Sequence, residues 1–430
     1  MSKFQIITLS IFILFIIAGV TAFATYKGSG SGETLPPITI WGTFPSDIFE
    51  QYAAMVSNAS TQKFTVSYTE KRPEQFSRDF ISVLARGRGP DAILITADMF
   101  LPHTDKIYPI PYELISQRDF RDTYIQEGEI YLFPDGLMAL PFTIDPLIMF
   151  WNRDTFDSAG IATYPRYWDE FDSLVAKLTT KDTNGNIRKS ALAMGEFSNI
   201  TNARELLGSL FLQAGNPIVS RTNNGFSITL FGTQNPSLSS PLQFFVRFAD
   251  PSNEDYSWNR GLPQSKSAFL GGTLAIYFGF ASELGDIHDK NPNLNFDAAL
   301  LPQLRTGGQK ATYGKMYGLS IVRASPNQSA TYEVIKALTL PENIAELSRT
   351  MYLPTVRRDL ITQGSSDSYI SIFNQAALVA RTWPDTDPAD SRQVFTTLVE
   401  SLTSGRRSIT QALNDAQDQY SSLLQQALEE

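Results

Sequence analysis

Strand and helix patterns alternate along residues 38–95, and this alternation restricts the possible folds more than any other feature of the sequence. Residues 38–41 and 64–68 are rich in the β-branched and aromatic residues typical of strands, and residues 92–95 form a third apolar run. Helical apolar spacing occupies the intervals, at residues 47–56 and 73–85. Strands that alternate with helices pair in parallel, so this region predicts a doubly wound α/β sheet.

The residues that follow each predicted strand are candidate site residues, because ligands of doubly wound sheets bind beyond the carboxyl ends of the strands. Thr43 and Phe44 follow the first strand, and Asp98 follows the third. Position is the only argument from the residues themselves, so the alternative that Thr43 and Phe44 simply begin a loop stays open.

A second unusual segment is the apolar stretch at residues 140–152, in which two prolines flank a single carboxylate, Asp145. Proline stiffens a connection and lacks the N–H that a sheet ladder needs, so the segment predicts a strand that crosses between two lobes. A chain of 430 residues is also too long for one ordinary core. Asp145 is then either a hydrogen-bonded structural acid or a ligand acceptor at the floor of a cleft.

Residue usage excludes several function classes. Cysteine is absent and His103 and His288 are the only histidines, which leaves no thiolate or Cys-based zinc site and little material for a Ser/His triad. The formal charge of -9, without a basic block, argues against a nucleic-acid partner. Residues 182–186 begin like a calcium loop but lack the closing glutamate, and are predicted to form a turn. We therefore expect neither a cofactor nor a metal site.

The N-terminal segment predicts export of the body. Residues 4–24 are an uncharged apolar run behind Lys3, about long enough to cross a bilayer as a helix. The run exceeds a typical signal-peptide core, and a flexible Gly-Ser tether follows at residues 28–32. We therefore expect a single-pass anchor in the cell membrane with an extracytoplasmic body. Cleavage after Ala24 would instead release a secreted protein.

Eight segments occur in the order and spacing of one known family. They are ITIW at 38–41, GPDAI at 89–93, the stretch from LPF at 140 to WNRDTF at 151–156, PRYWDEF at 165–171, SAFLGGTLAI at 267–276, YGLSI at 317–321, YLPT at 352–355 and SGR at 404–406. Together they resemble family 1 of the bacterial extracellular solute-binding proteins, which maltose-binding protein typifies. The matches span nearly the whole exported body.

The resemblance implies a two-lobed periplasmic-binding-protein-like fold of type II, in which each lobe is a doubly wound α/β sheet and one transmembrane helix precedes the first lobe. The segments that it implies are an anchor at 1–27, a linker at 28–37, lobe 1 at 38–142 plus 319–352, and lobe 2 at 146–316 plus 356–430.

The function implied is a monomeric, non-enzymatic receptor that closes on a small solute and delivers it to the permease of an ABC importer. A sugar is favoured, because its hydroxyls bind carboxylates and amides while its apolar face stacks on aromatic rings. By this resemblance, Phe280 matches the aromatic platform of the family, and five further positions match its ligand contacts: Thr43, Phe44, Ser46, Asp98 and Asp145. Tyr317 at the return crossover, the loop residue Trp383 and Asn199 are added as further candidates. The predicted ligand-binding residues are Thr43, Phe44, Ser46, Asp98, Asp145, Asn199, Phe280, Tyr317 and Trp383.

Two other functions are consistent with the same residues. Paired carboxylates near aromatic rings also describe an extracellular glycan-degrading enzyme. A ligand-sensing ectodomain is the second alternative, although almost no cytoplasmic tail precedes the predicted span.

Overall fold

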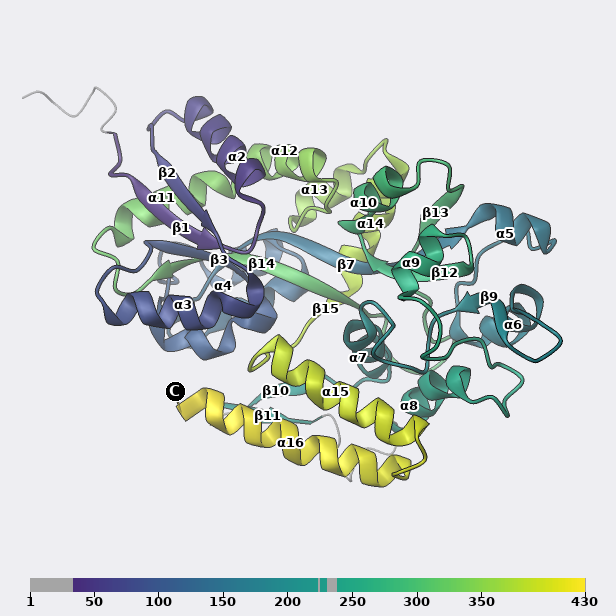
Figure 1. Cartoon of the computed structure of the whole chain (residues 1–430). Coiled ribbons are helices and arrows are strands. Elements are labelled where there is room, and N and C mark those ends of the chain that lie inside the picture. Colours follow the sequence, from purple (N-terminus) through teal and green to yellow (C-terminus); the bar gives the residue numbers. More distant parts are fainter. Residues whose placement is uncertain (1–33, 223–224, 230–237, 430) are drawn as a thin grey trace, which may run out of the picture.

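The computed structural model describes residues 34–222, 225–229 and 238–429, which form an α/β fold around one mixed eleven-stranded sheet (Figure 1). The main path of the sheet runs in the order β2 (Val66–Glu70), β1 (Ile38–Gly42), β3 (Ala92–Thr96), β14 (Thr312–Val322), β7 (Leu140–Asn152), β12 (Leu274–Phe280), β9 (Ile187–Leu192) and β8 (Thr180–Lys181). The strands beside this path are β4 (Ile107–Tyr108) and β15 (Ala380–Arg381) on β14, and β13 (Phe296–Ala299) on β7. Two separate hairpins are β5 (Leu132–Phe133) with β6 (Gly136–Leu137), and β10 (Val219–Thr222) with β11 (Gly225–Ile228).

Helices cover the sheet on both sides. The α-helices are α2 (Ser46–Ala59), α3 (Pro73–Ala85), α4 (Gln117–Thr123), α5 (Arg153–Ser158), α6 (Phe171–Leu178), α7 (Ala203–Gln213), α8 (Ser239–Val246), α9 (Ser265–Leu270), α10 (Glu283–Lys290), α11 (Gln328–Leu338), α12 (Pro341–Met351), α13 (Arg358–Gln363), α14 (Ser368–Val379), α15 (Pro388–Thr403) and α16 (Ile409–Glu429). Short 3-10 helices include η1 (Ala97–Met99), η2 (Leu101–Lys106) and η3 (Gln126–Tyr131).

The predicted alternation of strands and helices over residues 38–95 is confirmed. β1 pairs in parallel with both β2 and β3, and α2 and α3 lie on opposite sides of these strands (Figure 1). β2 begins two residues later than predicted. The reason is local: the backbone of Phe64 exchanges hydrogen bonds with the Ser57 hydroxyl of α2, at 3.1 Å and 2.6 Å, before the chain enters the ladder.

The Asp91 carboxylate links its own segment by hydrogen bonds to β1 and to the residues before α11. It accepts from the Thr39 N–H of β1 at 2.8 Å, and from the side chains of Ser325 and Asn327, which precede α11, at 2.6 and 3.1 Å. Burial acts to raise the pKa of Asp91, but the hydrogen bonds outweigh it and the pKa is lowered. Asp91 therefore remains ionised and holds the GPDAI segment against β1.

The predicted strand at residues 140–152 is confirmed as β7, which is buried along nearly all its length. Residues 140–146 pair with β14 and residues 147–151 pair with β12. The expectation that proline stays out of the ladder is wrong, because Pro141 and Pro146 both lie within β7. Each stands where the pairing changes: Pro141 lies beside a register shift in β14, and Pro146 lies where the partner changes to β12. A missing N–H is tolerated at such points.

The elements gather on either side of the β7–β14 pair (Figure 1). The first group comprises β1–β3, α2–α4, α11 and α12, with the loops between them. The second group comprises β9, β12, β13, α5–α10, α15 and α16. The carboxyl half of the sheet is also mixed, since β12 is parallel to β9 but antiparallel to β7. The sheet is continuous between the groups, and the predicted lobe boundaries remain a prediction.

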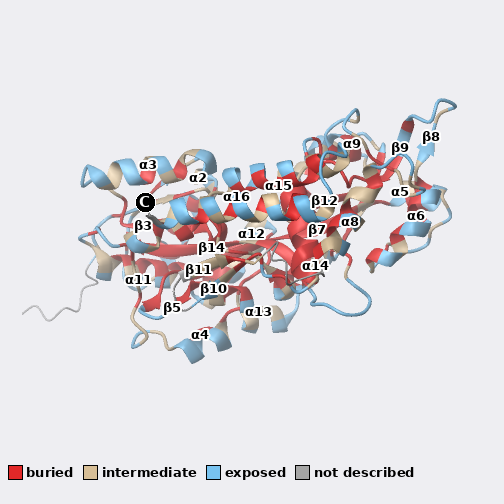
Figure 2. Cartoon of the chain, turned by 90° about the horizontal axis from the view of Figure 1, so that it is seen from below, coloured by how far each residue is buried: buried red, intermediate tan, exposed pale blue. Residues whose placement is uncertain are grey.

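The last helix, α16, packs along α15 and reaches η2 of the first group with its C-terminal part (Figures 1 and 2). A capping box forms the start of α16: Gln411 donates its backbone N–H to the Ser408 hydroxyl at 3.3 Å, and the Gln411 side chain accepts from the Ser408 N–H at 3.1 Å. The buried face of α16 consists of Ala412, Leu413, Ala416, Tyr420 and Leu424.

The predicted turn at residues 182–186 is present: the Asp182 carboxylate accepts from the N–H groups of Asn184 and Asn186.

In the described part of the chain, no helix has both the length and the apolar character needed to cross a bilayer. The apolar run at residues 4–24 lies outside the described residues.

Close packing at the β7–β14 pair gives a test of this architecture. A Cβ added at Gly318 would lie 2.7 Å from the Tyr131 ring and 2.8 Å from the Ala139 methyl group. We expect Gly318→Ala to lower the free energy of unfolding by about 1–3 kcal/mol, because the packed core must shift. Urea unfolding measures this change.

The matched control is Gly285→Ala in α10, where an added Cβ meets nothing within 4 Å. An exposed helical glycine gains about 0.5–1 kcal/mol on replacement by alanine, so this variant is expected to be slightly more stable. Equal behaviour of the two variants would contradict the packing described for Gly318.

Candidate functional site

A cavity of about 330 Å³ opens between the two groups of elements, within the size range of small-molecule sites. We call it the central cavity. The residues that the first group contributes are Thr43, Pro73, Glu74, Thr96, Asp98 and Met99. The rest of the wall, from β14 and the second group, consists of Arg204, Glu205, Lys315, Tyr317, Asp387, Pro388, Ala389 and Arg392. Polar side chains from both groups therefore face one space.

The topology explains why these residues meet. Thr43 follows the carboxyl end of β1 and its N–H bonds to the Leu94 carbonyl, while Asp98 lies in η1 directly after β3. Opposite them, α7 and α15 begin at the cavity. The turn into α7 requires Asn202 to adopt a left-handed conformation (φ 60°), which asparagine tolerates better than most residues. The cavity thus lies at the strand ends where the sequence predicted a site.

Asp98 is the most deeply placed acid of the cavity wall, at 5% exposure. Its Oδ2 accepts from the Tyr313 hydroxyl at 2.7 Å and lies 3.8 Å from the Arg204 Nη1. Its Oδ1 is buried and has no hydrogen-bond partner. A buried carboxylate oxygen without a donor is costly, so Asp98 has unused capacity to bind one.

Arg204 is 1% exposed and stands at the centre of a buried charge cluster. Three carboxylates lie within 4 Å of its guanidinium: Asp98, Glu205 at 3.1 Å, and Asp385 in direct contact. Its Nε donates to Ser391 at 3.0 Å, and its plane lies 4.6 Å from the Trp383 ring. Burial acts to lower the pKa of Arg204, but the nearby negative charges outweigh it and raise the pKa, so the guanidinium stays charged.

Asp385 supports Arg204 from inside the core. It accepts from the Tyr420 hydroxyl at 2.6 Å, from the Thr386 N–H at 2.8 Å and from the Ser391 hydroxyl. Burial raises the pKa of Asp385, and Arg204 opposes the rise. The arrangement fixes the start of α15 against α7 and sets the far wall of the central cavity.

Asp145 lies beside the cavity without lining it. Both oxygens are used by one residue, Ser282, whose N–H donates at 3.0 Å and whose hydroxyl donates at 2.6 Å. Burial raises the pKa of Asp145 to about 6, against the opposing charge of Lys315. Of the two roles that the sequence allows for Asp145, the structural acid and the ligand acceptor, its hydrogen bonds in the structure correspond to the structural acid.

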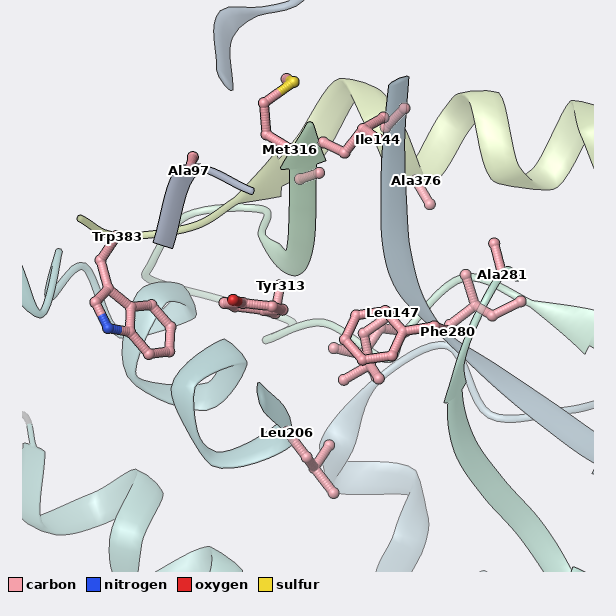
Figure 3. Packing of buried hydrophobic residues seen from close by; sticks show 14 of the residues in the cluster. Ala97, Ile144, Leu147, Leu206, Phe280, Ala281, Tyr313, Met316, Ala376 and Trp383 are labelled. Atoms are coloured by element: carbon pink, nitrogen blue, oxygen red, sulfur yellow. The ribbon is translucent and has the colours of Figure 1, made fainter. Parts of the chain in front are cut away.

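The aromatic residues predicted as stacking platforms are packed in the core. Figure 3 shows the Tyr313 ring between Trp383 and Phe280, with centroid distances of 5.1 and 6.1 Å. Trp383 is fully buried and donates its indole N–H to Tyr420, and the Lys315 ammonium covers Phe280 at 3.8 Å. Phe44 packs edge-on against Tyr317 at 5.2 Å. Only Tyr317 of the predicted aromatic residues lines the cavity.

Two polar residues of the predicted set lie away from the cavity wall. The Asn199 amide donates to the carbonyls of Asn259 and Leu262, both at 2.9 Å, and accepts from the Trp258 indole N–H, so its N–H groups and its oxygen are engaged within the protein. Ser46 begins α2, where its N–H bonds to the Glu70 carboxylate at 2.9 Å. The structure thus brings together Thr43, Asp98 and Tyr317 and leaves the other six predicted residues behind or beside the wall.

Residues that the sequence reasoning missed complete the wall, above all Arg204, Glu205 and Lys315. A signal existed for Arg204, because it opens the strongly apolar run of α7, and a charged residue that such a helix buries requires partners. Among the described residues, no group of three or more His, Asp or Glu side chains is arranged to hold a metal ion. Hydrogen-bonding and charged side chains make up most of the cavity wall.

An α/β fold whose two groups of elements enclose a ligand-sized cavity at the strand ends defines the periplasmic-binding-protein class. Residues 47–345 match the sequence profile described as "Bacterial extracellular solute-binding protein", which covers more than half of the chain. The chain belongs to that family.

Solved structures show the same fold at low sequence identity. A cyclo/maltodextrin-binding protein complexed with maltotetraose is 16% identical, with a TM-score of 0.72, covering 92% of this chain and 99% of that one. The GacH receptor of Streptomyces glaucescens GLA.O, studied unliganded and with acarbose, is 17% identical, with a TM-score of 0.70 and coverage of 91% and 99%. CpMnBP1 with mannotriose bound is 20% identical, with a TM-score of 0.67 and coverage of 89% and 99%.

The Arg204 cluster predicts a large effect of removing its single cation. Arg204→Met would leave three carboxylates without their counter-charge, so we expect a loss of about 3–5 kcal/mol in the free energy of unfolding, measured with urea. The control is Arg305→Met, which removes an exposed arginine paired with Asp169 and Glu170. Exposed pairs contribute little, so a comparable loss in this control would contradict the importance of burial.

The raised pKa of Asp145 predicts a pH dependence of stability. Between the unfolded pKa of 3.8 and the folded value of about 6, the folded state binds the proton more tightly than the unfolded state. Stability is therefore lost as the pH rises from about 4 to about 6, by on the order of 2–3 kcal/mol. Urea unfolding at pH 4 and at pH 7 measures this loss. The difference in the free energy of unfolding between the two pH values should be smaller in Asp145→Asn than in the wild type. A wild-type and a variant profile that stay parallel would show that Asp145 does not titrate in this window.

Proposed function

We propose that this chain is an extracytoplasmic receptor that captures a sugar or a short oligosaccharide in the central cavity and delivers it to the permease of an ABC importer. The observation that carries the proposal is the central cavity itself, whose polar wall is drawn from both groups of elements. The named ligands of the structural neighbours, maltotetraose, mannotriose and acarbose, support a saccharide as the solute.

The wall of the cavity suits a ligand with many hydroxyls. Asp98 and Glu205 are acceptors for hydroxyl donors, and the Thr43 hydroxyl both donates and accepts. The Tyr317 ring offers an apolar surface to the face of a sugar ring. We propose Thr43, Asp98 and Tyr317 as contacts from the predicted set, with the packed residues Phe44, Asp145 and Phe280 holding the wall in place. Direct contact by Ser46, Asn199 or Trp383 would require those side chains to leave their present partners.

Binding is proposed to be reversible, without covalent chemistry, and to be coupled to closure of two lobes. The segments 38–142 plus 319–352 and 146–316 plus 356–430 would move as units about the β7–β14 pair. A ligand that touches both walls binds the closed state more tightly and shifts the population toward it.

The N-terminal segment completes the proposal. Residues 1–27 would anchor the body in the cell membrane and residues 28–37 would act as a flexible linker, which keeps the receptor near a membrane permease. Cleavage after Ala24 would give the same body in secreted form.

A thermal-shift screen with mono- and oligosaccharides, followed by calorimetry, tests the function. A ligand that binds only the folded state raises the midpoint of unfolding. Asp98→Ala should weaken binding of the best sugar by about tenfold or more, since a hydrogen bond to a charged group contributes about 1.5–3 kcal/mol. The matched control is Asp289→Ala, an exposed acid in the last turn of α10, and this variant should bind normally.

Two outcomes would reject the proposal. The first is the absence of any midpoint shift over the whole saccharide panel. The second is turnover of a glycan by the purified body, which would favour a glycan-degrading enzyme instead.

A further inference from the structure

One cation serves three carboxylates at the wall of the central cavity. Asp98 and Glu205 both approach the same guanidinium atom, Nη1 of Arg204, at 3.8 and 3.1 Å, while Asp385 contacts Nη2. Arg204, Asp98 and Asp385 are all at least nine-tenths buried. If all three acids are ionised, two negative charges remain without a counter-charge in a region of low polarity, which is unfavourable.

The other cations of the cavity wall do not supply the missing charge. The Lys315 ammonium lies over the Phe280 ring at 3.8 Å, where the carboxylate that it opposes is Asp145. Arg392 is exposed at the rim and stacks over Phe197. Glu74 and Asp387 also line the cavity, so its wall carries four acids against three cations. The excess of acid in the cavity wall is therefore not removed by its own lysine and arginines.

An independent observation indicates that a donor is missing at this place. The Asp98 Oδ1 is buried and unpartnered, although its Oδ2 is fully engaged by Tyr313. Asp98 and Glu205 are both part of the cavity wall. The oxygens of Asp98 and Glu205 nearest Arg204 both lie within 4 Å of the same atom, Nη1, so the two carboxylates converge on one part of the wall.

We propose that the solute carries a protonated amino group, as an amino sugar does, and that Asp98 and Glu205 bind this group. The inference rests on the proposed function, since it takes the central cavity as the solute site. The ammonium supplies the donor that Asp98 lacks and a second positive charge for the cluster. Uronates and sugar phosphates would add negative charge to the acid excess and are excluded by the same argument.

Calorimetry with matched saccharides tests the proposal. The probes are glucosamine dimers and trimers, their N-acetylated counterparts, the neutral disaccharides maltose and mannobiose, and glucuronate. We expect the glucosamine oligomers to bind at least about tenfold more tightly than the N-acetylated ones, because only the former present a charged donor. Glucuronate should not bind.

Two variants connect this preference to the named carboxylates. Glu205→Gln and Asp98→Asn retain side-chain size but remove one negative charge each, and should reduce the preference to about threefold or less. Glu205 is the safer of the two to change, since it is less buried. Asp122→Asn, an exposed acid on α4, is the control and should retain the full preference.

The outcomes separate this inference from the proposed function. Neutral or N-acetylated sugars that bind as tightly as the amino forms would overturn the amine assignment and leave the sugar receptor standing. A preference for amino sugars that survives both charge-removing variants would also overturn it. Failure of every saccharide to bind would reject the proposed function and this inference together.

Discussion

The structure depends on one strand that belongs to two parts of a sheet. The amino-terminal half of β7 pairs with β14, which in turn pairs with β3 of the first group, and its carboxyl-terminal half pairs with β12 of the second group. Pro141 lies beside a register shift and Pro146 lies where the partner strand changes, and the glycine opposite Pro141 lets Tyr131 pack against the pair. The central cavity lies beside this pair. Residues after the strands of the first group and residues at the starts of α7 and α15 line it together with two residues of β14.

The fold was largely predictable from the sequence, and the site was predictable only in part. Alternating patterns over residues 38–95 are local signals, and they gave three strands and two helices in the right order. The place of the cavity followed from the rule of strand ends, which identified Thr43 and Asp98. Whether an aromatic ring lines a cavity or fills a core depends on distant partners. Trp383 is buried because Tyr420 and Tyr313 cover it, and the sequence around residue 383 contains no signal of either contact.

The buried charges around Arg204 illustrate why such a site was hard to predict. Thr386 and Ser391 are near Asp385 in the sequence, but Tyr420 comes from α16 and Arg204 comes from α7, so the full set of partners is not visible locally. Buried ion pairs are often no more stabilising than well-packed apolar residues of similar volume. The value of these contacts lies in holding α7 and α15 in one orientation, with Asp98 of the first group reached across the cavity. Stability is thus exchanged for a defined polar wall.

The late position of β14 in the chain has a consequence for biosynthesis. Strand β3 is completed on one side by β14, whose residues Tyr317–Ile321 are translated long after β3 itself, and α11 and α12 follow later still. A nascent chain that has emerged only as far as β7 therefore lacks the neighbour that closes its first sheet, and folding waits for distant contacts. Such a delay leaves the first sheet without one of its inner strands until most of the chain has been made.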